Sequence, residues 1–158
     1  MKFRIVLVIC ALLAVFIASN MTYEQQTIIP ELQTLLKDEP FKEPLSKLEV
    51  HYWHQTISVE TRGYVYFVEF LIRKATHFTG YGFIGIIFYA FYSRLKWRYA
   101  PLLAIATVFV IGSIDEFIQY HTPGRTGIFQ DVLIDTSGAI FWVTIAAMLH
   151  YFLKKRKA

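Results

Sequence analysis

Four carboxylates stand at the ends of two apolar segments in the second half of this 158-residue chain. They are Asp115, Glu116, Asp131 and Asp135, and Gln119 follows the first pair on the same segment. Charged groups at the margin of a hydrocarbon layer are costly to desolvate, so they persist where they are paired, hydrated or used. Their density here predicts a site rather than scattered anchors.

The residue types predict two kinds of chemistry. Carboxylates beside an imidazole can supply acid–base groups or hold a metal ion, which makes the candidate catalytic residues Asp115, Glu116, Asp131, Asp135 and His77. Oxygen ligands of this type favour Mg²⁺, Ca²⁺ or Mn²⁺ over zinc. A divalent cation such as Mg²⁺ is therefore a candidate cofactor, and the sequence does not assign the residues that would bind it. The candidate groups for holding an anionic substrate are Lys74, Arg125, Gln119 and Tyr81.

Helical spacing places these residues on shared faces, because positions i and i+4 lie on the same side of a helix. Three such stripes are present: Asp115 with Gln119, Asp131 with Asp135, and Lys74 with His77 and Tyr81. We expect three helices to converge so that Lys74, His77 and Arg125 face the carboxylates. The remaining excess of negative charge is balanced by protonated carboxyl groups, by a cationic His77 or by a metal ion.

The elements that must position this cluster are apolar. The chain is 55% hydrophobic and only 18% charged, and four segments approach the roughly 20 residues that cross a bilayer, at about 5–20, 75–92, 101–119 and 132–153. We therefore predict an all-α integral membrane protein, with residues 1–158 forming a single domain and four transmembrane helices. The first segment could be a cleaved signal peptide, but its apolar length and poor cleavage site favour a retained span.

Basic residues predict the topology. They cluster before the first span (Lys2, Arg4), after the second (Arg94, Lys96, Arg98) and after the fourth (154–157), and short basic segments stay cytoplasmic. Both termini are therefore expected in the cytoplasm, and the segment 21–74 between the first two spans is expected outside it. The same threading places the ionisable residues that are embedded near span ends at the outer leaflet: Lys74, His77, Asp115, Glu116, Asp131 and Asp135.

The outer segment 21–74 is too apolar for a disordered linker. Apolar spacing with Pro30 near its start predicts a helix around residues 28–36, and alternation predicts a short strand at 56–60. Residues 60–74 are expected to form a helix that rises into the second span. Glu69 is expected on a solvated ion-pair face, and Arg73 is expected to reach lipid headgroups.

The connection between the third and fourth spans contains a turn. Pro123-Gly124 fits the central positions of a type II turn, where glycine supplies the positive φ. Such a turn would fold Arg125 back over the ends of the spans. There the guanidinium could hold a carboxylate or a phosphate through two parallel hydrogen bonds.

Taken together, the polar residues resemble the VanZ-like family of bacterial membrane proteins. The motifs that carry the resemblance are Lys74-x-x-His77-x-x-x-Tyr81-Gly82, Asp115-Glu116-x-x-Gln119, Pro123-Gly124-Arg125-x-Gly127 and Asp131-x-x-x-Asp135-x-x-Gly138. The family's founding member is associated with low-level resistance to teicoplanin, a lipoglycopeptide that acts at the cell wall. The resemblance implies a multi-pass protein of the bacterial plasma membrane and cell envelope, linked to antibiotic resistance.

Three functions stay open at this point. The protein could bind or modify an anionic substrate at the outer leaflet, with membrane lipids, lipid-linked cell-wall precursors or the lipoglycopeptide as partners and no nucleic acid. It could be a non-enzymatic scaffold whose polar cluster is a structural ion-pair network, in which Asp131 caps a helix. Ion or proton movement ranks last, because the cytoplasmic halves of the spans carry no charge to complete a relay.

Overall fold

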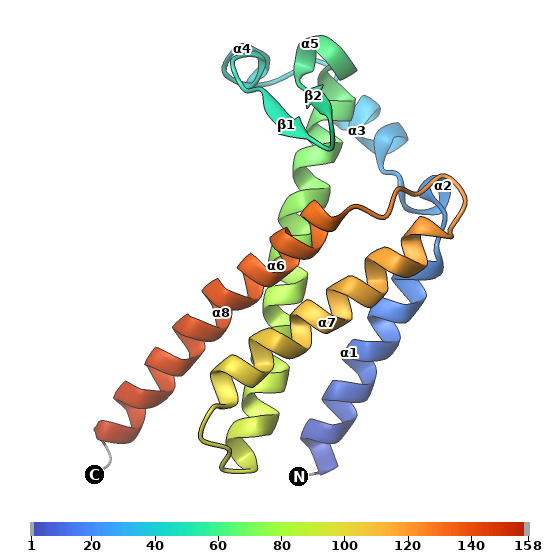
Figure 1. The fold of residues 1–158 in the computed structure, drawn as a ribbon. Coiled ribbons are helices and arrows are strands. Elements are labelled where there is room, and N and C mark those ends of the chain that lie inside the picture. The colour runs from blue at the N-terminus through green and yellow to red at the C-terminus, as the bar shows by residue number, and fades with distance from the viewer. Residues whose placement is uncertain (1, 157–158) are drawn as a thin grey trace.

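The computed structural model describes residues 2–156, and the chain is mostly helical (Figure 1). Four long helices form a bundle, and four short helices and one two-stranded hairpin lie between the first two long ones. In chain order the elements are α1 (Lys2–Asn20), α2 (Tyr23–Gln26), α3 (Ile29–Leu35), α4 (Lys42–Ser46), β1 (Val50–Tyr52), β2 (Gln55–Ile57), α5 (Val59–Arg62), α6 (Tyr64–Arg94), α7 (Ala100–Tyr120) and α8 (Phe129–Lys155).

Helix α6 is the centre of the bundle, and α1, α7 and α8 all pack against it. Small residues let the helices approach closely. A Cβ atom added at Gly85 of α6 would lie 2.9 Å from Val143 Cγ2 and 3.3 Å from the Cβ of Ala139, both on α8. At Gly138 of α8 an added Cβ would collide with the carbonyl oxygen of Phe78 on α6. The α6–α8 crossing therefore depends on glycines in both helices.

Three of the described helices, α1, α7 and α8, are long and apolar enough to span a membrane. They contain the expected spans 5–20, 101–119 and 132–153. The fourth expected span, 75–92, lies within the continuous helix α6, whose threonine, histidine, glycine and tyrosine residues reduce its mean hydropathy. That span stays a prediction.

The bundle is apolar outside, and its interior holds polar side chains beside an apolar core. Large hydrophobic side chains such as Phe16, Leu102, Phe117 and Leu149 are more than half exposed. The buried polar residues, in contrast, include most of the predicted site and are Ser19, Ser58, Glu69, Asp115, Glu116, Gln119, Asp131 and Asp135. Extensive exposed apolar surface is what a lipid-facing helix presents.

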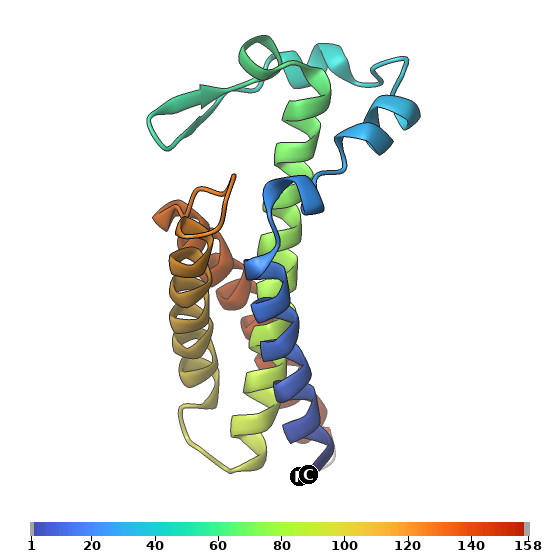
Figure 2. The same cartoon turned by 90° about the vertical axis from the view of Figure 1, so that its right-hand side faces the viewer.

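Both ends of the described chain and the α6–α7 connection lie at the same end of the bundle (Figures 1 and 2). The basic residues of these three places therefore gather at one end, as the predicted topology requires. Arg4 joins them there by donating to the carbonyl oxygen of Ala90 on α6. Lys157, the last basic residue, lies outside the described residues. Which side of a membrane this end faces stays a prediction.

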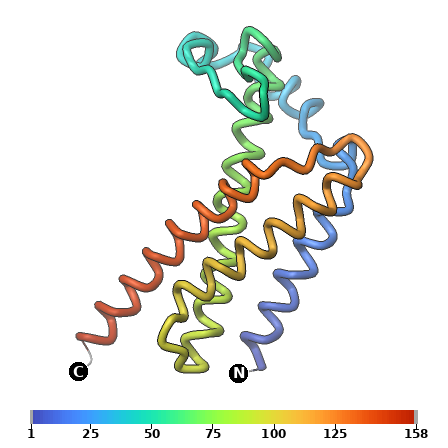
Figure 3. The backbone as a smooth tube through the Cα atoms, viewed as in Figure 1, coloured from blue at the N-terminus to red at the C-terminus, as the bar shows by residue number. Residues whose placement is uncertain are grey.

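At the opposite end α6 extends beyond the other long helices and carries the outer segment (Figures 2 and 3). A small core joins the two: Val59, Tyr64 and Phe67 are buried there, and Leu36 and Leu45 pack against them. The segment is therefore folded onto the bundle, in agreement with its apolar composition.

Local expectations for this segment are confirmed in part. Helix α3 has Pro30 in its first turn, as predicted, and α6 runs without a break from Tyr64 to Arg94. The predicted strand 56–60 is wrong in its second half, because β2 ends at Ile57. Ser58 caps α5 there through a hydrogen bond from the backbone N–H of Thr61 to its side chain, and the helix cap replaces the strand pairing.

Candidate functional site

Asp131 is held by two donors from distant parts of the chain. Lys74 Nζ on α6 donates to Asp131 Oδ1 at 2.6 Å, and the hydroxyl of Tyr52 on β1 donates to the same oxygen. Lys74 Nζ also lies 4.5 Å from the centre of the Tyr52 ring. Burial, followed by the hydrogen bond to Asp131, raises the pKa of the Tyr52 hydroxyl, which keeps it a donor. The hairpin therefore closes over the ion pair.

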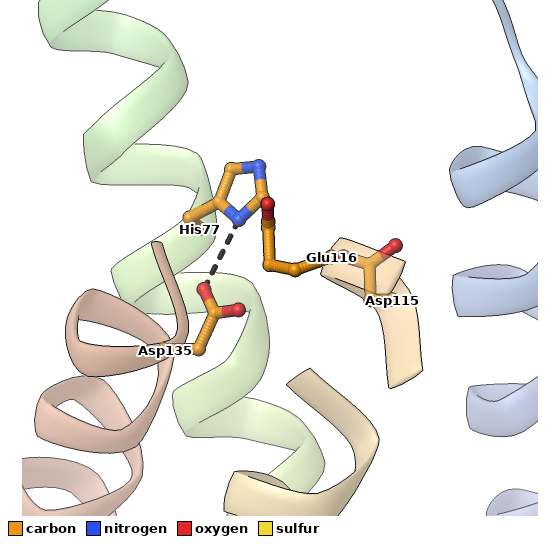
Figure 4. Close-up of side chains that lie close together, drawn as sticks. All are labelled: His77, Asp115, Glu116 and Asp135. Carbon is orange, nitrogen blue, oxygen red and sulfur yellow. Dashed lines mark hydrogen bonds and ion pairs between the residues drawn. The ribbon is translucent and has the colours of Figure 1, made fainter. Parts of the chain in front are cut away.

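His77 and Asp135 form the second link between α6 and α8 (Figure 4). His77 Nδ1 lies 3.0 Å from Asp135 Oδ1, and the Asp135 side chain is fully buried. The other oxygen, Asp135 Oδ2, has no hydrogen-bond partner within the described residues. It packs over Gly112 of α7, where an added Cβ atom would lie 3.1 Å away. Glycine at that position lets the carboxylate enter between α7 and α8.

Asp115 on α7 is bound from both neighbouring helices. The hydroxyl of Tyr81 on α6 donates to Asp115 Oδ2 at 2.5 Å, and Ser19 Oγ at the end of α1 makes a close hydrogen bond with Asp115 Oδ1. Ser19 is 1% exposed. Because α1 supplies this contact, the first apolar segment is part of the site as well as of the bundle.

Glu116, the next residue on α7, turns toward the start of α8. Its Oε2 accepts a 2.7 Å hydrogen bond from the backbone N–H of Ile128, whereas its Oε1 is buried without a partner within the described residues. The connection before α8 approaches α7 closely: a Cβ at Gly127 would collide with the carbonyl oxygen of Glu116. The Pro-Gly turn and the glycine after it thus bring the two helix ends together.

The predicted type II turn is present in this connection. Gly124 has φ +72°, and the backbone N–H of Arg125 donates to the carbonyl oxygen of Thr122 at 3.1 Å. The turn folds Arg125 back toward the bundle, as expected. Its guanidinium donates to two amide oxygens, those of Gln26 and Gln119, and no carboxylate contact of Arg125 is found in residues 2–156. Arg125 therefore forms no direct ion pair with a carboxylate there, and its expected use as a phosphate ligand stays a prediction.

A second guanidinium lies beside it. Arg73 donates to the same oxygen, Gln26 Oε1, at 3.4 Å, and also to Glu69 Oε1 at 3.4 Å. Burial, and then the positive charge of Arg73, lowers the pKa of Arg125. The two like charges thus converge on one neutral amide.

Glu69 anchors the outer segment on α6 before the apolar part of this helix begins. The expectation of a solvated Glu69 is wrong, because the residue is only 5% exposed. It accepts hydrogen bonds from the Tyr23 hydroxyl at 2.8 Å, the Thr27 hydroxyl at 2.7 Å and the Ile28 backbone N–H at 3.0 Å. Burial alone would raise the pKa of Glu69, but these hydrogen bonds and Arg73 together hold it below its ordinary value.

A cavity of about 760 Å³ lies between α1, α6 and α7. One part of its wall is polar and is formed by Gln25, Gln26, Glu69, Arg73, His77, Asp115, Gln119 and Arg125. The other part is apolar and is formed by small residues of α1 and aliphatic residues of α6, among them Ala11, Ala14, Val15, Ala18, Ile84 and Ile87. The cavity is thus amphipathic along its length.

A smaller cavity of about 290 Å³ lies under the hairpin. Lys74, Asp131 and Tyr52 line it, and Trp53 at the hairpin turn lines it as well. Five residues line both cavities: Glu69, Arg73, His77, Gln119 and Arg125. The two spaces therefore meet at the polar residues in the middle.

The structure brings all nine predicted site residues to one region between α6, α7 and α8. Several participants were not among them: Ser19, Tyr52, Gln26, Glu69 and Arg73 also belong to the polar network or the cavities. Three of these five residues, Ser19, Gln26 and Tyr52, precede α6 and lie far from the motifs in sequence, whereas Glu69 and Arg73 lie on α6 just before Lys74. For Ser19, the sequence offers one local signal of a role in the site, namely a polar residue near the end of the apolar segment 5–20.

Apolar helices that enclose a buried polar network define this chain as a helical membrane protein. The family comparison agrees with that class. The chain belongs to the VanZ/LLP1 family, whose model matches residues 3–150. The match confirms the resemblance drawn from the polar motifs. No curated protein and no solved structure gave a match.

Proposed function

We propose that this chain is a four-span protein of the bacterial plasma membrane, with both termini in the cytoplasm, that binds an anionic lipid-linked substrate at the outer leaflet. The observation that carries the proposal is the amphipathic cavity of about 760 Å³ between α1, α6 and α7. A ligand that fits it has a charged head and a long apolar tail. Membrane lipids and lipid-linked cell-wall precursors have this chemistry.

The head of such a ligand would sit at the two guanidiniums. Arg73 and Arg125 converge on Gln26, and each could hold an anion through charge-assisted hydrogen bonds, although Arg73 also donates to Glu69. Burial, and then the positive charge of Arg73, lowers the pKa of Arg125, and a phosphate placed there would offset the second of these causes. Both arginines lie at the end of the bundle that the basic residues of the termini do not occupy, as an outer-leaflet headgroup requires.

The tail would lie along α1 and α6. Three alanines of α1, Ala11, Ala14 and Ala18, recur every three or four residues on the face toward the cavity. Gly80 lines the opposite wall, and a Cβ atom added there would meet no atom within 4 Å. The small side chains therefore leave this volume open. An apolar tail in it would gain about 0.8 kcal/mol for each buried methylene.

Acid–base groups lie beside the proposed headgroup position. His77 and Asp115 line the same cavity as the two arginines. An enzyme that modifies a bound substrate needs such groups within reach of it. This arrangement supports modification of the lipid-linked substrate, and through it a change of the envelope that alters teicoplanin susceptibility.

Filling the cavity tests the proposal. Gly80→Phe should occupy the tail space and lower the retention of dioleoyl phosphatidate on the purified protein, measured by native mass spectrometry, at least tenfold. Gly80→Ala is the matched control, because one methyl group leaves most of the volume open, and it should retain the lipid like the unsubstituted protein. Equal retention by the phenylalanine and alanine variants would refute lipid binding in this cavity.

A structural role is the second candidate, because one observation favours it. Lys74 pairs with Asp131 and His77 with Asp135, so each of these two bases could serve only to join α6 to α8. Asp115→Asn, Arg125→Lys and Asp131→Asn, scored for membrane abundance and for lipoglycopeptide susceptibility, separate the two. Loss of the phenotype at normal abundance supports a working site, whereas parallel loss of both supports a scaffold.

A further inference from the structure

Four side chains from three helices, three carboxylates and one imidazole, converge inside the bundle. His77 of α6, Asp115 and Glu116 of α7 and Asp135 of α8 each offer one potential ligand atom, and these four atoms all lie within 4.8 Å of one another (Figure 4). Asp115, Glu116 and Asp135 are each at most 5% exposed. We infer that this cluster binds one divalent metal ion.

Two unpartnered oxygen atoms support the inference beyond the clustering of acids. Glu116 Oε1 and Asp135 Oδ2 are buried and form no hydrogen bond within residues 2–156. A buried carboxylate oxygen without a partner costs free energy, because it has lost its water and gained nothing in return. Figure 4 shows these two carboxylates turned toward the same space between α6 and α7. A cation there would give both oxygens a partner.

The hydrogen bonds around the cluster orient the ligands. In each of Glu116 and Asp135 one oxygen is held, by the Ile128 N–H at 2.7 Å and by His77 Nδ1 at 3.0 Å, and the other oxygen is left unpartnered. Asp115 is held by Tyr81 and by Ser19. Donors that fix the ligand carboxylates, such as the Ile128 N–H and the Tyr81 and Ser19 hydroxyls, are outer partners of the kind that metal sites use.

The charge balance also favours a cation. Lys74, the nearest lysine on α6, is already paired with Asp131 at 2.6 Å, and both arginines of the cavity bind amides or Glu69. His77 is thus the base that faces three carboxylates. Mutual repulsion of three buried anions is costly, and a divalent charge offsets it. The sequence left three explanations for the local excess of negative charge, and a bound metal ion is the one that we infer.

The ligand types indicate the class of metal. Carboxylates suit Mg²⁺, Ca²⁺ and Mn²⁺, and an imidazole suits later transition metals better than it suits Mg²⁺. One nitrogen with three carboxylates therefore fits Mn²⁺ well. The ion would lie beside the cavity that His77 and Asp115 line, within reach of a bound headgroup.

Titration of Mn²⁺ into the purified full chain in lipid-free detergent tests the inference, with free Mn²⁺ measured by electron paramagnetic resonance. We expect saturable binding of one ion, and at least tenfold weaker binding by Glu116→Gln and by Asp135→Asn. Glu60→Gln, an exposed acid on α5, is the control and should bind like the unsubstituted chain. Absence of saturable binding, or unchanged affinity in both cluster variants, would overturn the site.

A second measurement uses only the unsubstituted protein, in case a buried variant fails to fold. Mn²⁺ should raise the apparent Tm in a concentration-dependent manner, and a chelator should reverse the rise, because an ion that binds the folded state stabilises it. An unchanged Tm at saturating Mn²⁺ contradicts the inference. Since no lipid is present, the outcome is independent of the lipid-binding proposal, which is tested in the presence of a chelator.

Discussion

Replacement of Arg125 by glutamine removes a guanidinium that reaches the large cavity from the α7–α8 connection. Arg125 is half-buried, and its two terminal nitrogens donate to Gln26 and Gln119. A bound phosphate would take over at least one of these donors. A hydrogen bond to a charged group contributes about 1.5–3 kcal/mol, and about 1.4 kcal/mol is a tenfold change in Kd. We therefore expect Arg125→Gln to weaken binding of an anionic lipid by about 10- to 100-fold.

The assay compares dioleoyl phosphatidate with dioleoyl phosphatidylcholine on purified protein, with a chelator present. Arg125→Lys keeps the charge but loses the planar fork, so its affinity should lie between those of the unsubstituted protein and the glutamine variant. Arg98→Gln removes the same charge at the opposite end of the bundle and should leave the affinity within about twofold, the range of a distant surface charge. If Arg125→Gln and Arg98→Gln have the same effect, the charge acts through the general field and the headgroup position proposed at Arg125 is wrong.

Three further predictions concern stability and topology. Glu69→Ala removes the acceptor of four hydrogen bonds and should cost about 1–3 kcal/mol at pH 7. Because folding lowers the pKa of Glu69, its stabilisation is present above the unfolded pKa and is lost as pH falls through the folded pKa. Acidification below about pH 4.5 should therefore destabilise the unsubstituted protein more than the variant, as measured by thermal unfolding. Gly138→Ala should destabilise the bundle by about 1–3 kcal/mol or more through overpacking against the Phe78 carbonyl, whereas Gly80→Ala, which meets open space, should not; equal Tm values for the two would contradict the packing account. In a Cys10→Ala background, Thr126→Cys should react with a membrane-impermeant maleimide added to whole cells and Lys96→Cys should react only after lysis, and the reverse pattern would invert the proposed topology.

Much of the fold follows from local pattern. Apolar length predicted the helices that became α1, α7 and α8, and turn chemistry predicted the positive φ of Gly124. Both signals are local, because bilayer thickness sets helix length and glycine lacks the Cβ that forbids this φ. The limits of α5 and β2 were harder to predict, since the Ser58 cap competes with strand pairing over a few residues.

The partners of the site residues were less predictable. Spacing placed His77 and Asp135 on inward faces, and the structure joins them at 3.0 Å. The same reasoning paired Arg125 with a carboxylate, but Gln26 and Gln119 occupy its donors. Opposite charge alone predicts an ion pair. In the structure the turn places Arg125 beside Gln26 and Gln119, and its guanidinium donates to these nearby amide oxygens.

The sequence by itself determined which faces are polar, since helical periodicity is a property of the chain alone. It also determined the class of protein and its family, through apolar length and the spacing of the motifs. Only the tertiary structure decided which distant residues complete the site: Ser19 reaches Asp115 across 96 positions, and Tyr52 reaches Asp131 across 79. The physical reason is that such contacts depend on how closely and at what angle helices cross. That geometry is set where Gly85, Gly112 and Gly138 meet neighbouring helices, and no local signal encodes it.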